Sequence, residues 1–479
     1  MRVRRALGLA LSGALAAACS ATGATTPPAP APAPADPLAL VGISDLDPSP
    51  TVVEFALTAR EADKDLGGAK LSRAWTYNGA MPGPLVDAKV GDELVIHFKN
   101  ELPEPTMIHW HGIRLPIAMD GSPSSQKPVP PGGTFEYRFK LRDAGLFWFH
   151  PHVRTDVQIE RGLVGVIRVA PADPKEEPSV DEERVLVLDD VRVNADGSFP
   201  TYLDDNSKMM GREGNTVLVN GVRDARIALR PGAIERLRIL NAANGRFFNL
   251  KIPGVRFRVI GTDGGLVESP YDVDTLLIAP AERYDVVFQV PSAPGTLPLT
   301  SQPYERGHHT GELPPLPVAT LAIAGEPPSV KRALPERGPA VAKLPAPTGE
   351  AIPFALDEGT NAAGDLIFTL NGQVWPAVAA ARMALNETRV LEITNKSEMD
   401  HPFHVHGAFF QVLTRNGAPE PANRLANKDT IIVPAKSTLR VATRFDEIGA
   451  WMVHCHIEEH AEGGMMGEIL VGDAVSHAH

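Results

Sequence analysis

The sequence predicts an all-β protein made of three consecutive β-sandwiches. Alternating or β-branched runs, such as residues 93–97 and 163–169, are separated by Pro, Gly and Asp turns such as "PGP", "PPGG" and "DAG". Helical periodicity is scarce. The chain has 479 residues with 45 prolines and 42 glycines, and its strand pattern recurs three times, which indicates one sandwich repeated along the chain.

The first 19 residues predict an export signal. Arg2, Arg4 and Arg5 precede about a dozen apolar residues and a small-residue end, and that apolar run is too short to span a membrane. The Arg pair is also compatible with twin-arginine export. Cys19 either carries a lipid anchor or leaves with the cleaved leader. We therefore expect an exported protein of the periplasm or cell envelope.

Changes in composition divide the rest of the chain. A Pro/Ala-rich stretch at residues 20–39 predicts an extended linker. Three strand-rich blocks follow at residues 40–172, 180–325 and 351–473, with a Pro-rich linker at 326–350 before the last. In the first and third blocks a strand ("GDELVIHFKN", "ETRVLEITN") leads into histidine clusters. The middle block has no such cluster.

Charge and cysteine content limit the partners. The formal net charge is -12 and no Lys/Arg-rich run is present, which argues against nucleic acid or an anionic membrane surface. We expect a monomer that meets the membrane only through a lipid on Cys19. The chain has one further cysteine, Cys455, so no intramolecular disulfide is expected. Such a cysteine is either buried or used for chemistry.

Ten of the fifteen histidines lie in four short windows. These are "HWHG", "FHPH", "HPFHVHG" and "HCHIEEH". Chance would give roughly half a His-x-His pair in the whole chain, whereas these windows hold four. A fifth pair, His477 and His479, lies in the tail and is expected to be unimportant. His97, His308 and His309 have no partner at ligand spacing, so they are interpreted as ordinary core or surface histidines.

A His-x-His pair in a strand places both imidazoles on the same face, because side chains alternate between faces. Four such strands could direct eight imidazoles to one place. Two of these strands belong to the first block and two to the third, so that place would be the interface between those blocks. Imidazoles in this number suit copper, zinc or iron better than calcium or magnesium. Structural zinc fits poorly because it prefers four closed ligands, often thiolates.

The same alternation separates Cys455 from its two flanking histidines. Cys455 should point to the opposite face, where His460, Met465 and His401 are its neighbours by spacing. Two histidines, one thiolate and a weak axial thioether are the ligand set of a blue-copper electron-transfer site. One strand is therefore predicted to serve two different sites.

In order and spacing, the four windows resemble those of the multicopper oxidases, the family of laccases, cuprous oxidases and bilirubin oxidases. The resemblance covers nearly the whole chain after the first linker. It implies three cupredoxin-like Greek-key domains and four coppers per chain, one of type 1 and three in a trinuclear cluster between the first and third domains. It assigns the type 1 copper to His401, Cys455 and His460 with Met465 as axial neighbour, the type 2 copper to His109 and His404, and the type 3 pair to His111, His150, His152, His406, His454 and His456.

The reaction implied by the resemblance takes single electrons from a reducing substrate, with Cys455 on their path, and reduces O2 to two waters. That reduction needs protons, so a nearby carboxylate is expected. Asp120 stands where the family keeps such an acid, although Asp-Gly is also a turn signal. After His460, several bacterial relatives carry an acid immediately. Here that position is Ala461 and the acid is Glu462, which leaves the second proton route open.

The substrate is less well defined by the sequence. The eleven methionines are scattered and form no Met-rich insert, so we expect laccase-like oxidation of phenols or aromatic amines, with cuprous ion or another metal ion as the alternative. Met399 and Asp400 could receive a soft metal ion or form a solvated turn. A copper nitrite reductase would need fewer histidines. A non-catalytic cupredoxin-domain envelope protein would have lost ligands, and here all are present.

Overall fold

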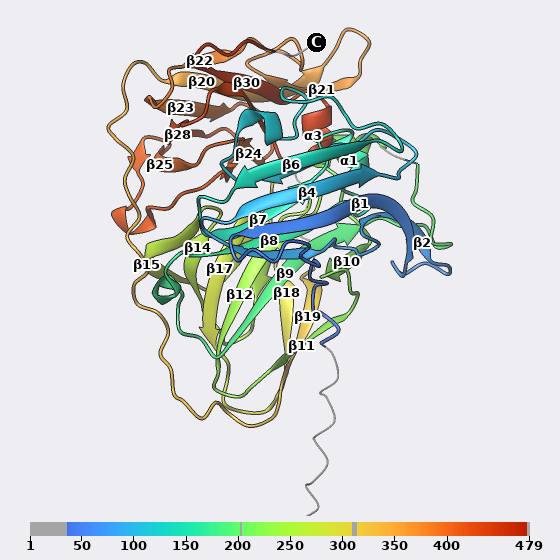
Figure 1. Ribbon diagram of the computed structural model, residues 1–479, viewed down its shortest axis with the longest axis vertical. Coiled ribbons are helices and arrows are strands. Elements are labelled where there is room, and N and C mark those ends of the chain that lie inside the picture. Colours follow the sequence, from blue (N-terminus) through green and yellow to red (C-terminus); the bar gives the residue numbers. More distant parts are fainter. Residues whose placement is uncertain (1–35, 202–203, 309–313, 477–479) are drawn as a thin grey trace, which may run out of the picture. The chain divides into compact units, whose positions relative to one another are not determined.

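The computed structural model describes residues 36–201, 204–308 and 314–476, and its regular structure is almost entirely β (Figure 1). The predicted leader with Cys19, His309 and the tail pair His477 and His479 lie outside the described residues. Within the described part, no helix combines the length and apolar character needed to cross a membrane. The predicted fold of three consecutive β-sandwiches is confirmed by six sheets in three pairs.

The first sandwich is formed by two four-stranded sheets. Its elements are β1 Val52–Lys64, β2 Ser72–Tyr77, β3 Leu85–Lys89, β4 Glu93–Asn100, β5 His109–His111, η1 Ile117–Met119, β6 Thr134–Lys140, β7 Gly145–His150, α1 Thr155–Gln158 and β8 Gly165–Ala170. The sheets have the orders β2-β1-β4-β6 and β3-β8-β7-β5. Burial alternates along β1, as expected for a strand with one face on a core. The edge strand β5 carries two of the predicted ligands.

The middle sandwich is larger and has the sheet orders β10-β9-β12-β17-β14-β15 and β11-β19-β18-β13-β16. Its elements are η2 Pro174–Glu176, β9 Glu182–Val191, α2 Asp205–Met210, β10 Thr216–Val219, β11 Ala225–Leu229, β12 Ile234–Asn241, β13 Phe248–Lys251, β14 Phe257–Thr262, β15 Gly265–Val273, β16 Leu276–Ile278, β17 Arg283–Gln289, β18 Gly295–Ser301 and β19 Leu316–Ile323. Leu38, inside the predicted first linker, is buried in the core of this sandwich, and its carbonyl accepts a hydrogen bond from Asn220.

The third sandwich has the sheet orders β21-β20-β23-β28-β25-β26 and β22-β30-β29-β24-β27. Its elements are β20 Ile352–Thr360, β21 Leu366–Leu370, β22 Ala381–Met383, β23 Thr388–Asn395, β24 His401–Val405, β25 Phe410–Arg415, β26 Ala418–Pro419, η3 Ala422–Arg424, β27 Thr430–Val433, β28 Thr438–Arg444, β29 Gly449–Cys455, α3 Glu458–Glu462 and β30 Met466–Val471. The strands β24 and β29 are neighbours and carry four of the predicted ligands, His401, His404, His454 and Cys455.

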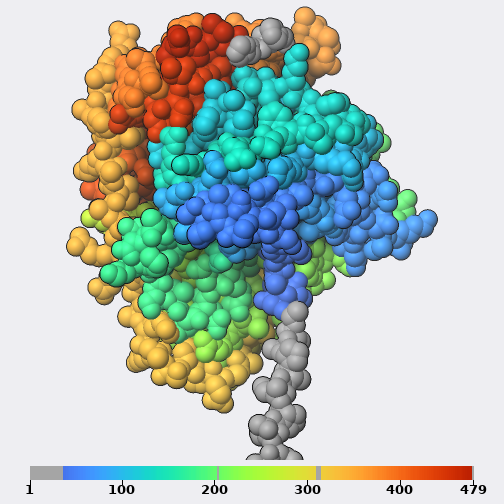
Figure 2. All heavy atoms as spheres, viewed as in Figure 1, coloured from blue at the N-terminus to red at the C-terminus, as the bar shows by residue number. Residues whose placement is uncertain are grey.

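The first and third sandwiches share one hydrophobic cluster. It includes Trp110 and Phe149 of the first sandwich and Phe403 and Trp451 of the third, all buried. The middle sandwich has a separate cluster of its own. In Figure 2 the blue-to-cyan first sandwich adjoins the orange-to-red third sandwich across the upper part of the view. The interface between the two therefore contains a buried apolar cluster, like a domain interior.

Arg283, at the start of β17 in the middle sandwich, forms hydrogen bonds to the first and third sandwiches. Its Nε donates to the Leu146 carbonyl in β7 at 3.0 Å, and its two terminal nitrogens donate to the Asp429 carboxylate at 2.6 and 2.5 Å. Its backbone N–H donates to Asp263. All these side chains are buried. A planar guanidinium can donate two parallel hydrogen bonds to one carboxylate, whereas a lysine ammonium cannot.

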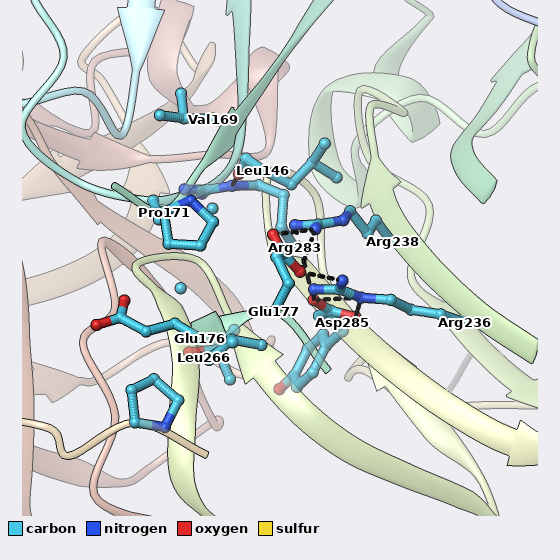
Figure 3. A pocket seen from close by; sticks show the side chains of 16 residues that line it. Leu146, Val169, Pro171, Glu176, Glu177, Arg236, Arg238, Leu266, Arg283 and Asp285 are labelled. Carbon is cyan, nitrogen blue, oxygen red and sulfur yellow. Dashed lines mark hydrogen bonds and ion pairs between the residues drawn. The ribbon is translucent and has the colours of Figure 1, made fainter. Parts of the chain in front are cut away.

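A second charged network lies in the middle sandwich beside a cavity of about 60 Å³, which residues of the first sandwich also line (Figure 3). Arg236 forms an ion pair with Asp285 at 2.5 Å, and Arg238 forms one with Glu177 at 3.0 Å. Figure 3 shows Leu146 and Val169 of the first sandwich on the other side of the cavity. Because carboxylates already pair with these guanidinium groups, we interpret the network as structural.

Replacing Arg283 by Met should lower the free energy of unfolding by on the order of 3 kcal/mol, because it leaves the Asp429 carboxylate buried without its cation. Thermal denaturation of the metal-free protein measures the effect. Arg73→Met is the control, since the Arg73 side chain is 63% exposed in its pair with Glu61 and such pairs contribute little. Equal melting temperatures for the two variants would contradict this role of Arg283.

Candidate metal centres

Two pairs of neighbouring strands bring the predicted ligands together. β5 lies beside β7 with His109 opposite His150, and β24 lies beside β29 with His404 opposite His454. From the edge strand β5, His111 reaches Asp429 of the third sandwich at 3.1 Å. The ligands therefore meet at the interface between the first and third sandwiches.

Only the pair in β5 lies wholly within a strand. In the other three pairs, the second histidine follows the last residue of its strand. The expectation that each pair lies inside a strand is thus wrong for His152, His406 and His456. These residues are still buried in the same interface, because His406 and His456 directly follow their strands and His152 is separated from β7 by Pro151 alone.

Eight buried imidazoles form what we call the histidine cluster. Its members are His109, His111, His150, His152, His404, His406, His454 and His456. Two triplets are defined within it, one with centroid distances of 5.0 to 5.6 Å (His111, His150, His456) and one with distances of 5.1 to 5.2 Å (His152, His406, His454). The triplets are also in contact with each other and with the other two rings, since His454 lies 5.3 Å from His456, and His109 and His111 stack on His406 and His404 at 3.8 and 3.7 Å. The remaining two, His109 and His404, lie 5.9 Å apart.

In seven of the eight rings, a protein acceptor holds one nitrogen. The acceptors are backbone carbonyls for His109, His150, His404 and His454, and carboxylates for His111, His406 and His456. An acceptor of this kind requires an N–H, so the opposite nitrogen carries a lone pair. Metal-binding histidines are commonly fixed in this way.

The opposite nitrogens are buried and lack partners. Among the described residues, those without a hydrogen bond are Nε2 of His109, His150, His152, His404 and His456, and Nδ1 of His111. Buried polar atoms are usually satisfied, so six exceptions in one place fit a site that binds a metal ion. His111 offers Nδ1, whereas the other rings offer Nε2, because the Asp429 carboxylate accepts from its Nε2.

His406 and His454 give the most direct test of fit. Nδ1 of His406 donates to Asp120, and Nδ1 of His454 donates to the Cys455 carbonyl. Each Nε2 is therefore a lone pair, yet these two atoms lie 3.0 Å apart. Two facing lone pairs repel one another unless a cation binds both. The donor set is thus suited to a transition metal that prefers imidazole.

A second group, the cysteine group, consists of His401, Cys455 and His460. The Cys455 sulfur lies 3.5 Å from Nδ1 of His401 and 3.8 Å from Nδ1 of His460, and all three residues are fully buried. Burial raises the pKa of the Cys455 thiol, so a thiolate there requires a positive ion beside it. Cys455 points away from the histidine cluster, as alternation predicts.

Met465 adjoins the cysteine group through the backbone. Its N–H donates to the His460 carbonyl at 3.0 Å, and its carbonyl accepts from the Cys455 N–H at 3.1 Å. The Met465 side chain is fully buried. The loop containing α3 thus returns to the end of β29, which places the predicted axial residue next to the group.

Asp120 contacts both halves of the histidine cluster. Its carboxylate accepts from His406 at 3.0 Å, and its carbonyl accepts from His109 at 2.8 Å. Burial alone would raise the pKa of Asp120, but His406 and His109 outweigh it and hold that pKa well below its usual value. The turn reading also applies, since Gly121 has φ +71° and a Cβ there would lie 1.7 Å from the Ile108 carbonyl.

Glu462 does not take the position expected of a second acid, whereas Glu458 contacts the cluster. The Glu462 side chain accepts from the N–H and hydroxyl of Thr155 in α1. Glu458, which the sequence reasoning missed, is buried and lies 2.8 Å from Nδ1 of His456. The sequence feature that could have indicated Glu458 is its position two residues after the predicted ligand His456. Ala461 packs in an apolar cluster with Met452, which explains the absence of an acid there.

The residues ahead of His401 are not a solvated turn. Met399 is fully buried, and Asp400 accepts hydrogen bonds from the Tyr304 hydroxyl and the Ala435 N–H. The solvated-turn interpretation is therefore wrong. The lone histidines have protein partners, since His97 pairs with Glu54 and His308 with Glu358.

Comparisons with known proteins agree with this geometry. Residues 59–174, 183–322 and 346–475 each match a family model described as multicopper oxidase. The chain is 33% identical to multicopper oxidase MmcO of Mycobacterium tuberculosis, covering 87% of this chain and 86% of that protein, and 26% identical to the laccase of Bacillus subtilis, covering 84% and 91%. The solved multicopper oxidase from Campylobacter jejuni, described as a metallo-oxidase, superposes with a TM-score of 0.82 at 31% identity, covering 91% and 94%.

The metal-free protein should lose stability as the pH falls below about 6.5, the pKa of a histidine in the unfolded chain. Burial lowers the pKa of His401 to about 3, and burial together with His109 lowers that of His406 to about 4. Between about pH 6.5 and these lowered pKa values, the unfolded chain binds protons that the folded protein does not. The free energy of unfolding therefore falls as the pH falls, by about 1.4 kcal/mol per pH unit for each histidine.

Thermal denaturation of the metal-free protein at pH 8, 6 and 5 measures this dependence. His406→Gln should reduce the slope of melting temperature against pH, while His97→Gln, a change at an exposed ion pair, should not. An unchanged slope in His406→Gln would show that the buried cluster is not the source.

Proposed function

The chain belongs to the multicopper oxidase family, and on that basis we propose that it oxidises small reducing substrates one electron at a time and passes four electrons to O2, giving two waters. The facing lone pairs of His406 and His454 are the observation that carries this proposal. Bound copper would supply the one-electron redox chemistry and the site for O2. The protein supplies ligands, their orientation and the exclusion of water.

We propose four coppers per chain. The cysteine group with Met465 would hold the type 1 copper, and His109 with His404 would hold the type 2 copper. The type 3 pair would be held by the two triplets, His111, His150 and His456, and His152, His406 and His454. The second triplet is supported by its ligand nitrogens, which lie within 4.8 Å of one another. The atoms that His111, His150, His152 and His456 would offer are supported by their unpaired nitrogens.

Strand β29 joins the two centres through covalent bonds. Cys455 stands between His454 and His456, and its side chain points to the opposite face. The distance between the two centres is therefore set by one residue of backbone and its side chains. Carbonyl and carboxylate acceptors fix the imidazole orientations in advance, so little rearrangement is needed when the charge changes.

Two buried carboxylates are proposed to assist the histidine cluster. The Asp120 carboxylate accepts from Nδ1–H of His406, and the Glu458 carboxylate faces Nδ1–H of His456. Both therefore fix the ring tautomer that leaves Nε2 free. Glu462, which we predicted from sequence as the second acid, has its carboxylate on Thr155 instead.

For the substrate, we propose phenols or aromatic amines, as in a laccase. The likeness to the Bacillus subtilis laccase supports this class. Oxidation of a metal ion is the second candidate, supported by the likeness to the Campylobacter jejuni metallo-oxidase. Asp400 does not favour the second candidate, because its carboxylate is already occupied by Tyr304 and Ala435.

The cellular setting also remains our proposal. We infer export to the periplasm or cell envelope from the leader, anchoring through Cys19 if that residue is lipid-modified, and a monomeric protein. The domain limits at residues 40–172, 180–325 and 351–473 belong to the same proposal. The strands of the three sandwiches lie within them.

Oxygen uptake by the copper-loaded protein, with a phenol compared against cuprous ion at matched pH, tests the function and the substrate class. We expect uptake with both and a higher kcat/KM for the phenol. Cys455→Ser should abolish the blue colour and the uptake together, because it removes the thiolate. Uptake that persists at full rate in Cys455→Ser would contradict the proposed electron entry.

Glu458→Ala should weaken copper binding in the histidine cluster by about 10- to 100-fold, because it leaves Nδ1 of His456 without its acceptor. Glu458→Gln keeps an acceptor oxygen and should retain the copper. Copper per chain after dialysis against a chelator is the measurement, with Glu462→Ala as the control. If Glu458→Ala keeps as much copper as the control, then Glu458 does not position His456.

A further inference from the structure

Strand β30 carries a buried carboxylate, Glu468, that lies outside both metal centres. Its side chain belongs to a residue that is 2% exposed. Its Oε1 accepts from the Ser124 hydroxyl of the first sandwich at 2.5 Å, and its Oε2 accepts from the Ser476 hydroxyl. In the described part of the chain, no Lys, Arg or His side chain forms an ion pair with it. A buried carboxylate without a cation is costly, so these hydrogen bonds must offset that cost.

Glu468 projects from the same face of its sheet as the histidine cluster. On β30 it lies opposite Met452 of β29, while Met466 lies opposite His454. Residues opposite one another in an antiparallel pair share a face, and so do residues two apart in one strand. Glu468 is therefore roughly 7 Å along β30 from the residue beside His454. The Met452 carbonyl also accepts from the His406 N–H at 3.0 Å, so the same pair of strands holds the backbone of a proposed ligand.

The loop of residues 120–125 links Glu468 to the histidine cluster. It begins at Asp120, whose carboxylate accepts from His406, and it contains Ser124, whose hydroxyl donates to Glu468. Hydrogen bonds within its second half close a turn, so the loop is compact. Within the described residues, these two side-chain contacts are the hydrogen bonds that join the loop to the third sandwich. The loop is therefore held there at two points, and one of them is Glu468.

The first half of the loop has little room to adjust. The Gly121 backbone packs so closely on the Ile108 carbonyl that a Cβ there would lie 1.7 Å from the carbonyl oxygen. The Asp120 carbonyl accepts from Nδ1 of His109 at 2.8 Å, in addition to the contact of its carboxylate with the third sandwich. Because close-packed segments transmit a displacement, movement at Ser124 should displace both acceptors that Asp120 offers to the cluster.

We propose that Glu468 is a positioning residue for the histidine cluster. Through the hydrogen bond from Ser124 it holds the loop of residues 120–125 on the third sandwich, and so it keeps both acceptors of Asp120 against their histidines. The inference rests on the proposed function, because it requires coppers bound by these histidines. It adds a residue that touches no ligand and that determines how firmly the cluster holds its metal.

This role predicts different effects on the two metal centres. The cysteine group has no hydrogen bond to Glu468 or to residues 120–125 in the described structure, and the Cys455 side chain points to the opposite face of β29. Loss of the Glu468 side chain should therefore loosen copper in the histidine cluster and leave the type 1 copper bound. A general loss of stability would affect both centres instead.

The test measures copper per chain after dialysis of the copper-loaded protein against a chelator, together with the blue absorbance and the electron paramagnetic resonance signal of the type 2 copper. Glu468→Ala should lower the affinity of the histidine cluster for copper about three- to tenfold, less than the roughly 10- to 100-fold expected for an acceptor that touches a ligand ring. The blue absorbance should be unchanged. Glu468→Gln keeps an acceptor oxygen for Ser124 and should retain copper as the original protein does.

Ser124→Ala removes the other partner of the same hydrogen bond and should cause a similar loss of copper. The double variant with Glu468→Ala should lose no more than the worse single variant, because both act through one contact. Glu387→Ala is the matched control. Glu387 is a carboxylate of the third sandwich that also accepts from a hydroxyl, that of Thr348 at 3.2 Å, but it precedes β23 at the end away from His401. Its copper content should equal that of the original protein.

Equal copper retention in Glu468→Ala and Glu387→Ala would overturn the inference, as would a loss of blue absorbance in step with the loss of cluster copper. An equal loss in Glu468→Gln would overturn it too, because the hydrogen bond would then not be the cause. If Glu468→Ala does not fold, Ser124→Ala decides, since it removes a single hydroxyl. An original protein that binds no copper in the histidine cluster would refute the proposed function itself. A protein with four coppers whose retention ignores Glu468 would refute this inference alone.

Discussion

The site depends on imidazoles in which one ring nitrogen donates a hydrogen bond to the protein and the other nitrogen is left with a free lone pair. Carbonyl and carboxylate acceptors fix one nitrogen in seven of the eight rings, so the opposite lone pairs converge in a buried interface. The 3.0 Å approach of two such lone pairs, on His406 and His454, is unfavourable without a cation. Metal binding and domain association are linked in the cluster as a whole, because four of its eight imidazoles come from the first sandwich and four from the third.

The packing of the three sandwiches serves this interface. A continuous hydrophobic cluster joins the first and third sandwiches and keeps water from the imidazoles. Arg283 of the middle sandwich neutralises Asp429, and Asp429 in turn holds His111 and His404. The middle sandwich thus supports one centre through a buried ion pair and contacts the other through α2, where the Met209 carbonyl accepts a hydrogen bond from His460. The middle sandwich therefore contributes to both centres although it supplies no predicted ligand.

Alternation along strands predicted much of the site from the sequence. It placed Cys455 opposite its flanking histidines, which follows from local geometry. The interface between the first and third blocks was predicted from the number of imidazoles, which suit one shared site. Alternation could not show that His111 offers Nδ1, since this depends on Asp429 from another sandwich. Glu458, the apolar setting of Ala461 and the bond from His460 to Met209 were missed for the same reason: each is defined by contacts between segments far apart in sequence or by the path of a loop.

Anomalous diffraction at the copper absorption edge, from crystals of the copper-loaded protein, would test the central claim most directly. The account predicts four copper peaks: one in the cysteine group, one between His109 and His404, and one in each triplet, with His111 bound through Nδ1. An empty space between His406 and His454, with these two nitrogens still in contact, would contradict it.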